Sequence, residues 1–204
     1  MRVVKADDYQ TWFIEEDGFG VLIDPWLDKK LNPESSVLLQ RERQEASTLS
    51  QKELGQVRVA IITAPFIDHL HIPSIKKLNN KVKIITTKKV RKILIKNQID
   101  NPITCIDNQV MEVGPFKLSV FPAGFPYSWS AFCFFLENTE GKTIFHEGHM
   151  ANFLKLKRLK RKCDAVLITL DKVKFLGIIT LSMGPKEGFK TARLLDSKRI
   201  MATG

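Results

Sequence analysis

The chain has 204 residues, of which 44% are hydrophobic, and it carries a formal net charge of +10 at pH 7. No stretch approaches the roughly 20 uninterrupted apolar residues of a membrane span, and the N-terminus lacks the apolar run of a signal peptide. Three isolated cysteines exclude a disulfide framework and a Cys-x-x-Cys metal knuckle. We therefore expect one cytoplasmic domain over residues 1–204, without membrane association and of undetermined oligomeric state.

The first half of the chain predicts a hairpin followed by alternating strands and helices. Residues 9–14 and 21–24 flank an acidic turn with a glycine, which is typical of a β-hairpin. The polar stretch 28–56 predicts a long loop with a short helix near 41–46. Residues 57–63 form a nearly continuous apolar run suited to a buried strand. The expected elements that follow are a helix at 73–78, a strand at 83–87 and a helix at 90–95.

The second half begins with consecutive strands and then returns to alternation. The expected strands cover residues 103–106, 110–113, 116–121, 131–136 and 142–145. A basic helix at 151–161, a strand at 165–169, a helix at 185–195 and a strand at 199–202 complete the chain. Strand-rich halves that are each followed by helices predict an α/β fold with two sheets and outer helices, the four-layer αββα sandwich.

All four histidines lie in two short clusters, Asp68-His69-Leu70-His71 and His146-Glu147-Gly148-His149. Each cluster follows a predicted strand and includes a carboxylate. Imidazole nitrogens and carboxylate oxygens are the usual ligands of zinc and of neighbouring metals. Two loops from distant parts of the chain could close around one ion, so the clusters predict a metal or catalytic site. The alternative is that the histidines occupy exposed loop positions without a chemical role.

Four segments resemble the metallo-β-lactamase superfamily, in the branch near the bacterial L-ascorbate-6-phosphate lactonase and related zinc-dependent hydrolases. They are Val21-Leu22-Ile23-Asp24-Pro25-Trp26-Leu27, residues 61–71, residues 144–149, and Ser182-Met183-Gly184-Pro185-Lys186-Glu187. The resemblance covers nearly the whole chain and implies the metallo-β-lactamase-like sandwich. It also implies that Asp24, at a strand end, supports the metal ligands by hydrogen bonds.

The chain departs from the superfamily's His-x-His-x-Asp-His pattern. Ala64 and Phe66 stand where that pattern has its first two histidines, and neither side chain can bind an ion. The next expected histidine is absent from residues 122–125, His149 stands in place of the bridging aspartate, and Thr203 lies near the position of the final histidine. A standard binuclear zinc site cannot be built from these residues, and the chain stops at Gly204, earlier than several branches of the superfamily.

We interpret the remaining clusters as a relocated mononuclear site for zinc, manganese or iron. Its expected ligands are His69, His71, Glu147 and His149, and Asp68 is the expected general base. The alternative for Asp68 is a loop cap that accepts backbone N–H bonds. His146 ends a strand, faces away from Glu147 in this interpretation, and would support the site without binding the metal.

Three functions follow from this interpretation. The first is a metal-dependent hydrolase that acts on a small, anionic substrate, and the second is a catalytically inactive binding protein, which the missing ligands favour. The third is an RNA-binding or RNA-processing protein, based on the basic stretch 155–162, although such a helix usually docks by its leucines and leaves its lysines in water. Nucleic acid is therefore not the favoured partner. Phe125, Tyr127 and Trp129 fall in the loop that lacks the ligand histidine, and they either line the pocket or belong to the core.

Overall fold

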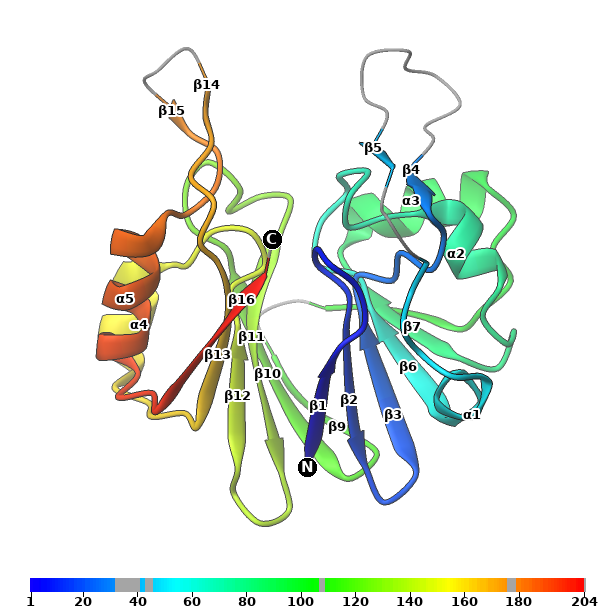
Figure 1. The fold of residues 1–204 in the computed structure, drawn as a ribbon, viewed down its shortest axis with the longest axis horizontal. Helices are drawn as coiled ribbons and strands as arrows, with labels where there is room; N and C mark the ends of the chain where they lie inside the picture. The colour runs from blue at the N-terminus through cyan, green and yellow to red at the C-terminus, as the bar shows by residue number, and fades with distance from the viewer. Residues whose placement is uncertain (32–40, 43–45, 107–108, 176–178, 204) are drawn as a thin grey trace. The chain divides into compact units, whose positions relative to one another are not determined.

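The structure is a computed structural model that describes residues 1–31, 41–42, 46–106, 109–175 and 179–203. The chain divides into two compact units, Met1–Ile106 and Asp107–Gly204. Each unit is built on one six-stranded sheet of mixed strand direction, as Figure 1 shows. None of the helices in these described ranges has the length and apolar character needed to cross a bilayer.

The sheet of the first unit combines an antiparallel hairpin region with a parallel region. Its antiparallel part begins with a hairpin whose turn residues, Asp17 and Gly18, both have positive φ angles of 49° and 78°. Such angles match the twist of a two-residue hairpin loop and explain the Asp-Gly pair. In spatial order the strands are β1 (Arg2–Lys5), β2 (Trp12–Glu16), β3 (Phe19–Ile23), β6 (Val57–Ile61), β7 (Lys83–Thr86) and β8 (Ile103–Cys105), and the pairs from β3 onward are parallel.

Three helices accompany this sheet: α1 (Gln51–Gln56), α2 (Ile72–Lys76) and α3 (Lys88–Lys96). Ile75 of α2 and Val90 and Leu94 of α3 are fully buried, because apolar residues spaced three or four apart form one helix face. They belong to one hydrophobic cluster with alternate residues of the strands, among them Phe13, Leu22, Ala60 and Ile84. This cluster is the core of the first unit.

The stretch 28–56 differs from its prediction as a loop with a helix near 41–46. Residues 43–45 and 32–40 lie outside the described residues, while Arg41–Glu42 (β5) pairs with Lys30–Leu31 (β4) as two short antiparallel strands. The helix lies further along, at Gln51–Gln56. It starts there because Ser50 and Glu53 form a capping box, in which the Ser50 hydroxyl accepts the Glu53 N–H and Glu53 accepts the Ser50 N–H.

The sheet of the second unit has four consecutive antiparallel strands and then two parallel ones. In spatial order they are β9 (Val110–Val113), β10 (Phe116–Pro122), β11 (Phe132–Asn138), β12 (Thr143–His146), β13 (Ala165–Thr169) and β16 (Arg199–Thr203). A short hairpin, β14 (Lys174–Phe175) and β15 (Ile179–Thr180), lies between β13 and the last helix in the sequence.

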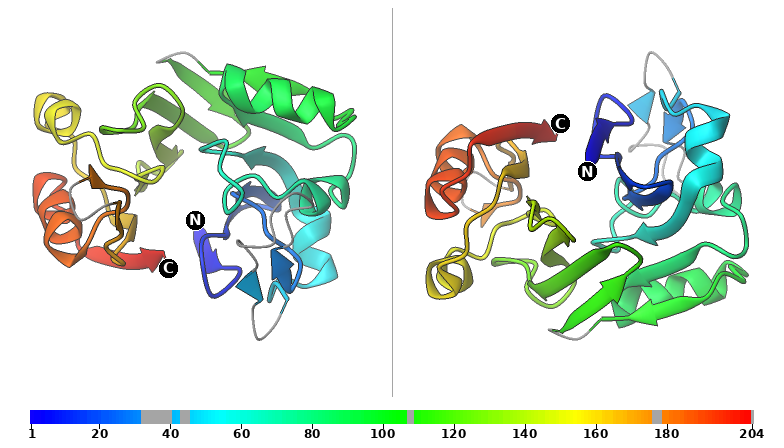
Figure 2. Two further views of the ribbon diagram at one scale, coloured as in Figure 1. Left: turned by 90° about the horizontal axis from the view of Figure 1, so that it is seen from above. Right: turned by 90° about the horizontal axis from the view of Figure 1, so that it is seen from below.

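The helices of the second unit are α4 (Phe153–Leu159) and α5 (Pro185–Leu194), which lie side by side in both views of Figure 2. Gly188 brings α5 close to β13, since a Cβ at this position would clash with Leu170 and lie 3.1 Å from Ile168. Thr191 and Ala192 are buried on the same face. The side of α5 that carries small residues therefore packs on the sheet, and the larger side chains point outward.

Candidate metal-binding residues in two histidine loops

The first histidine loop begins beside the ends of two neighbouring parallel strands. Asp24 directly follows β3 and Thr63 follows β6 after one intervening residue, and the Asp24 N–H donates to Ile61 O at 2.9 Å. Because the carboxyl ends of parallel strands meet at the same edge of a sheet, the two side chains come together there. Asp24 has a φ of 45°, a left-handed conformation that aspartate tolerates better than most residues.

Asp24, Thr63 and His69 form a buried hydrogen-bonded cluster. The Asp24 carboxylate accepts the Thr63 N–H at 2.7 Å on Oδ1 and the Thr63 hydroxyl at 2.6 Å on Oδ2. The same Oδ2 lies 2.8 Å from His69 Nδ1. A carboxylate oxygen can only accept, so the proton of the imidazole is on Nδ1. In the neutral ring the lone pair of His69 is then on Nε2, at the opposite edge of the ring, which is the arrangement of a metal-binding histidine.

Asp68 lies next to that edge of the imidazole. Its Oδ2 is 3.9 Å from His69 Nε2, and the side chain is partly exposed. Two side chains donate to Oδ2: the Tyr9 hydroxyl at 3.2 Å and the Gln10 amide at 3.1 Å. These two donors to Asp68 are thus neutral side chains from the segment before β2.

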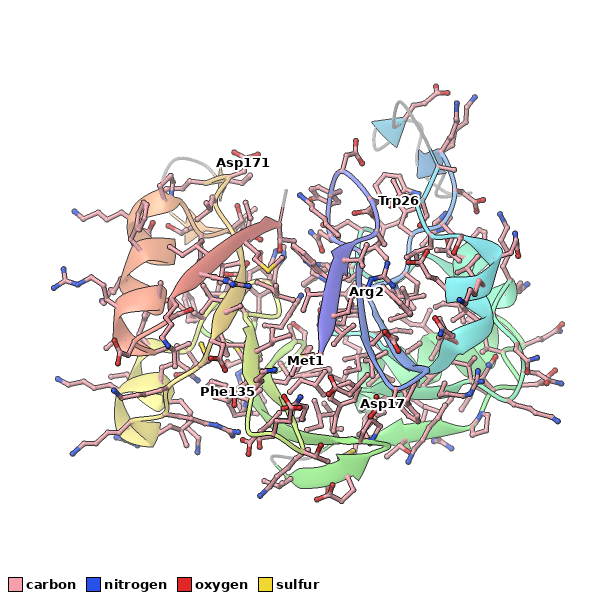
Figure 3. The ribbon with its side chains drawn as sticks, turned by 60° about the horizontal axis from the view of Figure 1, so that its bottom comes forward. Met1, Arg2, Asp17, Trp26, Phe135 and Asp171 are labelled. Atoms are coloured by element: carbon pink, nitrogen blue, oxygen red, sulfur yellow. The ribbon has the colours of Figure 1, made fainter. Side chains whose placement is uncertain are left out.

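His71 has a different set of contacts. It is the N-cap residue of α2, and its Nδ1 lies 2.6 Å from the Ser74 hydroxyl oxygen, which also accepts the Leu27 N–H at 2.7 Å. The Trp26 ring lies 6.2 Å from the His71 ring. Trp26 is in the loop after β3, where Figure 3 labels it. His71 is buried, and it links the first turn of α2 to the loop that follows Asp24.

The two positions that lost histidine are filled by apolar side chains. Ala64 is fully buried, and the Phe66 ring meets the His69 ring edge-on at 6.2 Å. The Phe66 carbonyl accepts the N–H groups of His69 and Leu70 at 3.0 and 2.7 Å. The backbone turn that presents His69 is therefore intact, although these two side chains supply no ligand atoms.

The second histidine loop follows β12. Glu147 is buried, and its Oε1 accepts the Thr169 N–H at 2.6 Å, at the end of the parallel neighbour β13. His146 is also buried, and its ring stacks on Phe134 at 5.1 Å. Its Nδ1 accepts the Gly148 N–H at 3.0 Å, so His146 shapes the turn that leads to His149.

Gly148 and His149 form a turn of two residues with positive φ, at 55° and 92°. A Cβ on Gly148 would overlap the Phe132 carbonyl, so only glycine fits there. His149 carries a side chain, and a backbone with this φ angle costs such residues roughly 1–3 kcal/mol. Its ring meets Tyr127 edge-on at a centroid distance of 4.4 Å. Backbone strain of this kind is common at functional sites, which makes His149 a candidate functional residue.

The aromatic loop 123–131 packs on the second histidine loop. The Gly124 N–H donates to Met150 O at 2.8 Å, and Gly124 approaches Ala151 so closely that a Cβ would clash with the Ala151 carbonyl. Tyr127 contacts His149, whereas Phe125 and Trp129 are 81% and 95% exposed. Phe125 and Trp129 are therefore surface residues outside the hydrophobic core.

The cysteines offer no thiolate ligand in either loop. Cys133 and Cys163 are buried, and burial raises the pKa of the Cys163 thiol to about 11. Burial also raises the pKa of Cys133, whose sulfur donates to Glu147 O at 2.8 Å. Both thiols remain protonated at neutral pH, and the candidate ligands are imidazoles and carboxylates.

The sequence identified Asp24, Asp68 and the histidines but not the residues that orient them. Asp24 is bonded by Thr63, and Asp68 is bonded by Tyr9 and Gln10. His71 is bonded by Ser74, and Glu147 accepts the Thr169 N–H. Tyr9 and Gln10 are 59 and 58 positions from Asp68, so no local pattern connects them. Thr63 could have been found from its place just past a buried strand adjacent to the one that ends at Asp24.

The two mixed sheets with their helices match solved structures of the metallo-β-lactamase fold, which confirms the predicted fold class. A family model described as "Beta-lactamase superfamily domain" also matches residues 5–204. The chain therefore belongs to the β-lactamase superfamily, as the sequence resemblance predicted. No curated protein matches the sequence.

Three of the similar solved structures show the range of this fold. An isothiocyanate hydrolase from Delia radicum gut bacteria has a TM-score of 0.79 at 19% identity, over 99% of this chain and 84% of that one. A possible metal-dependent hydrolase from Veillonella parvula has a TM-score of 0.76 at 16% identity, over 99% and 85%. Human tRNase Z, short form, has a TM-score of 0.64 at 14% identity, over 98% and 86%.

Proposed function

We propose that the chain is a metal-dependent hydrolase with a mononuclear site that acts on a small, anionic substrate. The observation that carries this proposal is the buried Asp24–Thr63–His69 cluster, which fixes the proton of His69 on Nδ1. A divalent metal requires a neutral imidazole with an oriented lone pair, and a carboxylate behind the ring supplies both conditions.

The proposed ligands come from both histidine loops: His69 and His71 from the first, Glu147 and His149 from the second. Zinc fits this mixture of nitrogen and oxygen donors, and manganese and iron are the alternatives. When bound, the metal would supply Lewis acidity to the bond that is cleaved and would acidify a water molecule. The substrate class is supported by the net charge of +10, which favours anions near the protein.

The other roles belong to side chains of the first unit. Asp68 accepts the proton of the attacking water as general base, and Tyr9 and Gln10 hold the carboxylate in place. These two hydrogen bonds orient the Asp68 carboxylate. Thr63 orients Asp24 through two hydrogen bonds, and Asp24 in turn orients His69.

Elemental analysis of protein purified without added metal tests the ligand set. We expect stoichiometric zinc, manganese or iron in the wild type and its loss in the His69→Ala, His149→Ala double variant. Single His71→Ala and Glu147→Gln variants then show whether these two side chains bind the ion or only support their loops. A wild-type protein without metal would refute the hydrolase proposal.

Thr63→Val tests the hydrogen-bonded cluster separately from the ligands. Loss of the hydroxyl should weaken metal affinity by about 10- to 100-fold, measured by competition with a chromogenic chelator. Thr86→Val is the matched control, because Thr86 is equally buried in the adjacent strand β7 and donates to Ile62 O at 2.7 Å, away from Asp24. Equal affinities in the two variants would contradict the role of Thr63.

Asp68→Asn tests the general base. This variant should retain the metal and lose roughly 100-fold or more of its rate on bis(p-nitrophenyl) phosphate, an anionic probe, measured beside the neutral probe p-nitrophenyl acetate. Loss of the metal from Asp68→Asn would instead make Asp68 a ligand.

A catalytically inactive binding protein is the second candidate. Ala64 and Phe66 support it, because apolar side chains fill positions at which the superfamily pattern has histidines. Wild-type protein that contains no metal and hydrolyses neither probe would favour this function.

A further inference from the structure

The outward side of α5 carries an aromatic ring surrounded by cations. Phe189 is 59% exposed, and Lys186, Lys190 and Arg193 are exposed around it. Together with Leu194 these residues line a groove of about 640 Å³. A single exposed apolar side chain is ordinary on a protein surface, so the notable feature of Phe189 is the set of cations around it.

These three cations have no acidic partner among the described residues. The nearby acids are engaged elsewhere: Glu187 pairs with Lys172 at 2.7 Å, and Asp196 pairs with Lys162 at 2.6 Å. Lys190 instead lies over the Phe153 ring of α4, at 4.6 Å from its centroid. The groove therefore presents a positive charge that no ion pair balances among the described residues of this unit.

Helix α4 lies beside α5 (Figure 2) and also carries exposed cations, among them Lys155 and Lys157. The sequence predicted that its leucines would dock and leave its lysines in water, but only Leu156 is buried, and Leu154 and Leu159 are 74% and 41% exposed. The prediction holds for one leucine and is wrong for the other two, so α4 adds apolar side chains as well as positive charge to the surface of this unit.

We propose that the α5 groove and the adjoining face of α4 bind single-stranded RNA. Single-strand binding combines a positive groove that follows the phosphates with aromatic rings on which bases stack. Lys186, Lys190 and Arg193 recur at helical spacing and supply the charge, while Phe189 supplies the ring. A protein segment that binds a membrane inserts a protruding apolar face into the lipid. The Phe189 ring instead lines a groove between cations, which favours a nucleic acid over a membrane.

Fluorescence anisotropy with a labelled 20-nucleotide oligo(U) tests this proposal on the full chain. At 50 mM salt we expect micromolar binding that weakens steeply as salt rises. The K186E/K190E/R193E variant should lose at least 100-fold in affinity, and its log–log salt slope should fall by about 2, since each phosphate contact on a single strand contributes about 0.7. Phe189→Ala should bind about tenfold more weakly at every salt concentration, because stacking is not screened.

The matched control makes the same change in net charge on another helix. Lys88, Lys89 and Lys92 are exposed on α3 of the first unit, and K88E/K89E/K92E should bind oligo(U) at most a few-fold more weakly than the wild type. Circular dichroism and thermal melting of every variant establish that it is folded. His69→Ala should bind oligo(U) like the wild type, which separates this proposal from the metal site.

Three results would overturn the proposal. The first is absence of oligo(U) binding at 50 mM salt, and the second is an equal loss of affinity in the α3 variant. The third is an unchanged affinity of Phe189→Ala together with stronger binding to vesicles of phosphatidylserine and phosphatidylcholine, which would assign the surface to membrane lipids. A blunt oligo(U)·oligo(A) duplex should bind more weakly than the single strand, because its bases are not available to Phe189.

Discussion

His149 is held in its conformation by the residues around it. The Gly148 N–H bonds to His146, the Gly148 Cα lies against the Phe132 carbonyl, and the Tyr127 ring contacts the imidazole. A histidine with a φ of 92° persists only where such contacts fix it. These contacts therefore fix the position of the His149 imidazole in the second histidine loop.

Gly148→Ala should destabilise the protein by about 2–4 kcal/mol, from steric overlap with Phe132 and from the left-handed backbone. Gly141→Ala is the matched control, since Gly141 has a φ of 79° but nothing lies within 4 Å of its missing Cβ. The control should lose only the backbone contribution, about 1 kcal/mol. Urea denaturation of both variants measures the difference, and equal losses would show that the close approach to Phe132 does not constrain this turn.

The protonation of His69 likewise depends on residues far away in the sequence. Asp24 is 45 positions earlier, and Thr63 bridges the two. The resemblance pointed to Asp24 from its place at a strand end, but the direction of the hydrogen bonds, and so the position of the proton on Nδ1, follows only from the contacts of the folded chain.

Both units have the same contact at the carboxyl ends of two neighbouring parallel strands, in which an acidic side chain accepts the N–H of a threonine. Asp24 after β3 accepts a backbone N–H from Thr63 beyond β6, and Glu147 after β12 accepts one from Thr169 at the end of β13. In each case the strands are parallel neighbours. Parallel pairing leaves N–H groups at the carboxyl edge of the sheet, and a carboxylate there satisfies them.

Helix α1 is attached to the edge strand β1 by an ionic hydrogen bond. Glu53 accepts from Arg2 and from Ser50, and these bonds, with the Arg2 bond first, lower the pKa of Glu53 from 4.5 to about 2. A carboxyl whose pKa is lower in the folded state stabilises the protein above its unfolded pKa and loses that effect as pH falls toward the folded value.

Glu53→Gln should therefore cost about 1 kcal/mol of unfolding free energy at pH 7. The gap between wild type and variant should shrink as the pH falls below 4.5 toward about 2, measured by urea denaturation between pH 7 and pH 3. Glu112→Gln makes the same change in charge at an exposed glutamate on β9 and is the matched control. A gap that stays constant with pH would contradict the ionic role of Glu53.

For the whole protein, metal binding should increase the free energy of unfolding. A ligand that binds only the folded state at 100 times its dissociation constant adds about 2.7 kcal/mol to the unfolding free energy, which for a chain of this length raises Tm by roughly 5–10 °C. We expect this shift with Zn²⁺ in differential scanning fluorimetry. Mg²⁺, which prefers all-oxygen sites, should produce much less, and His69→Ala should remove the shift; an equal shift in that variant would place the ion elsewhere.

Most strands and helices could be predicted from the sequence alone, because their apolar periods of two and about 3.6 residues are local properties. The sequence also predicted the fold class, since the order of the elements restricts the topology. Two elements without a strong apolar period, β1 and α1, were not predicted. Strand β1 is defined by its pairing with β2, and α1 is defined by the capping box at its start.

The contacts of each candidate site residue depend on the folded chain. Strand pairing brought Asp24 to Thr63 and placed the Asp24 carboxylate at Nδ1 of His69. The first turn of α2 placed Ser74 beside His71, and packing on the sheet turned Phe189 outward among lysines. These contacts join residues that chain folding brings together, so no window of the sequence contains them.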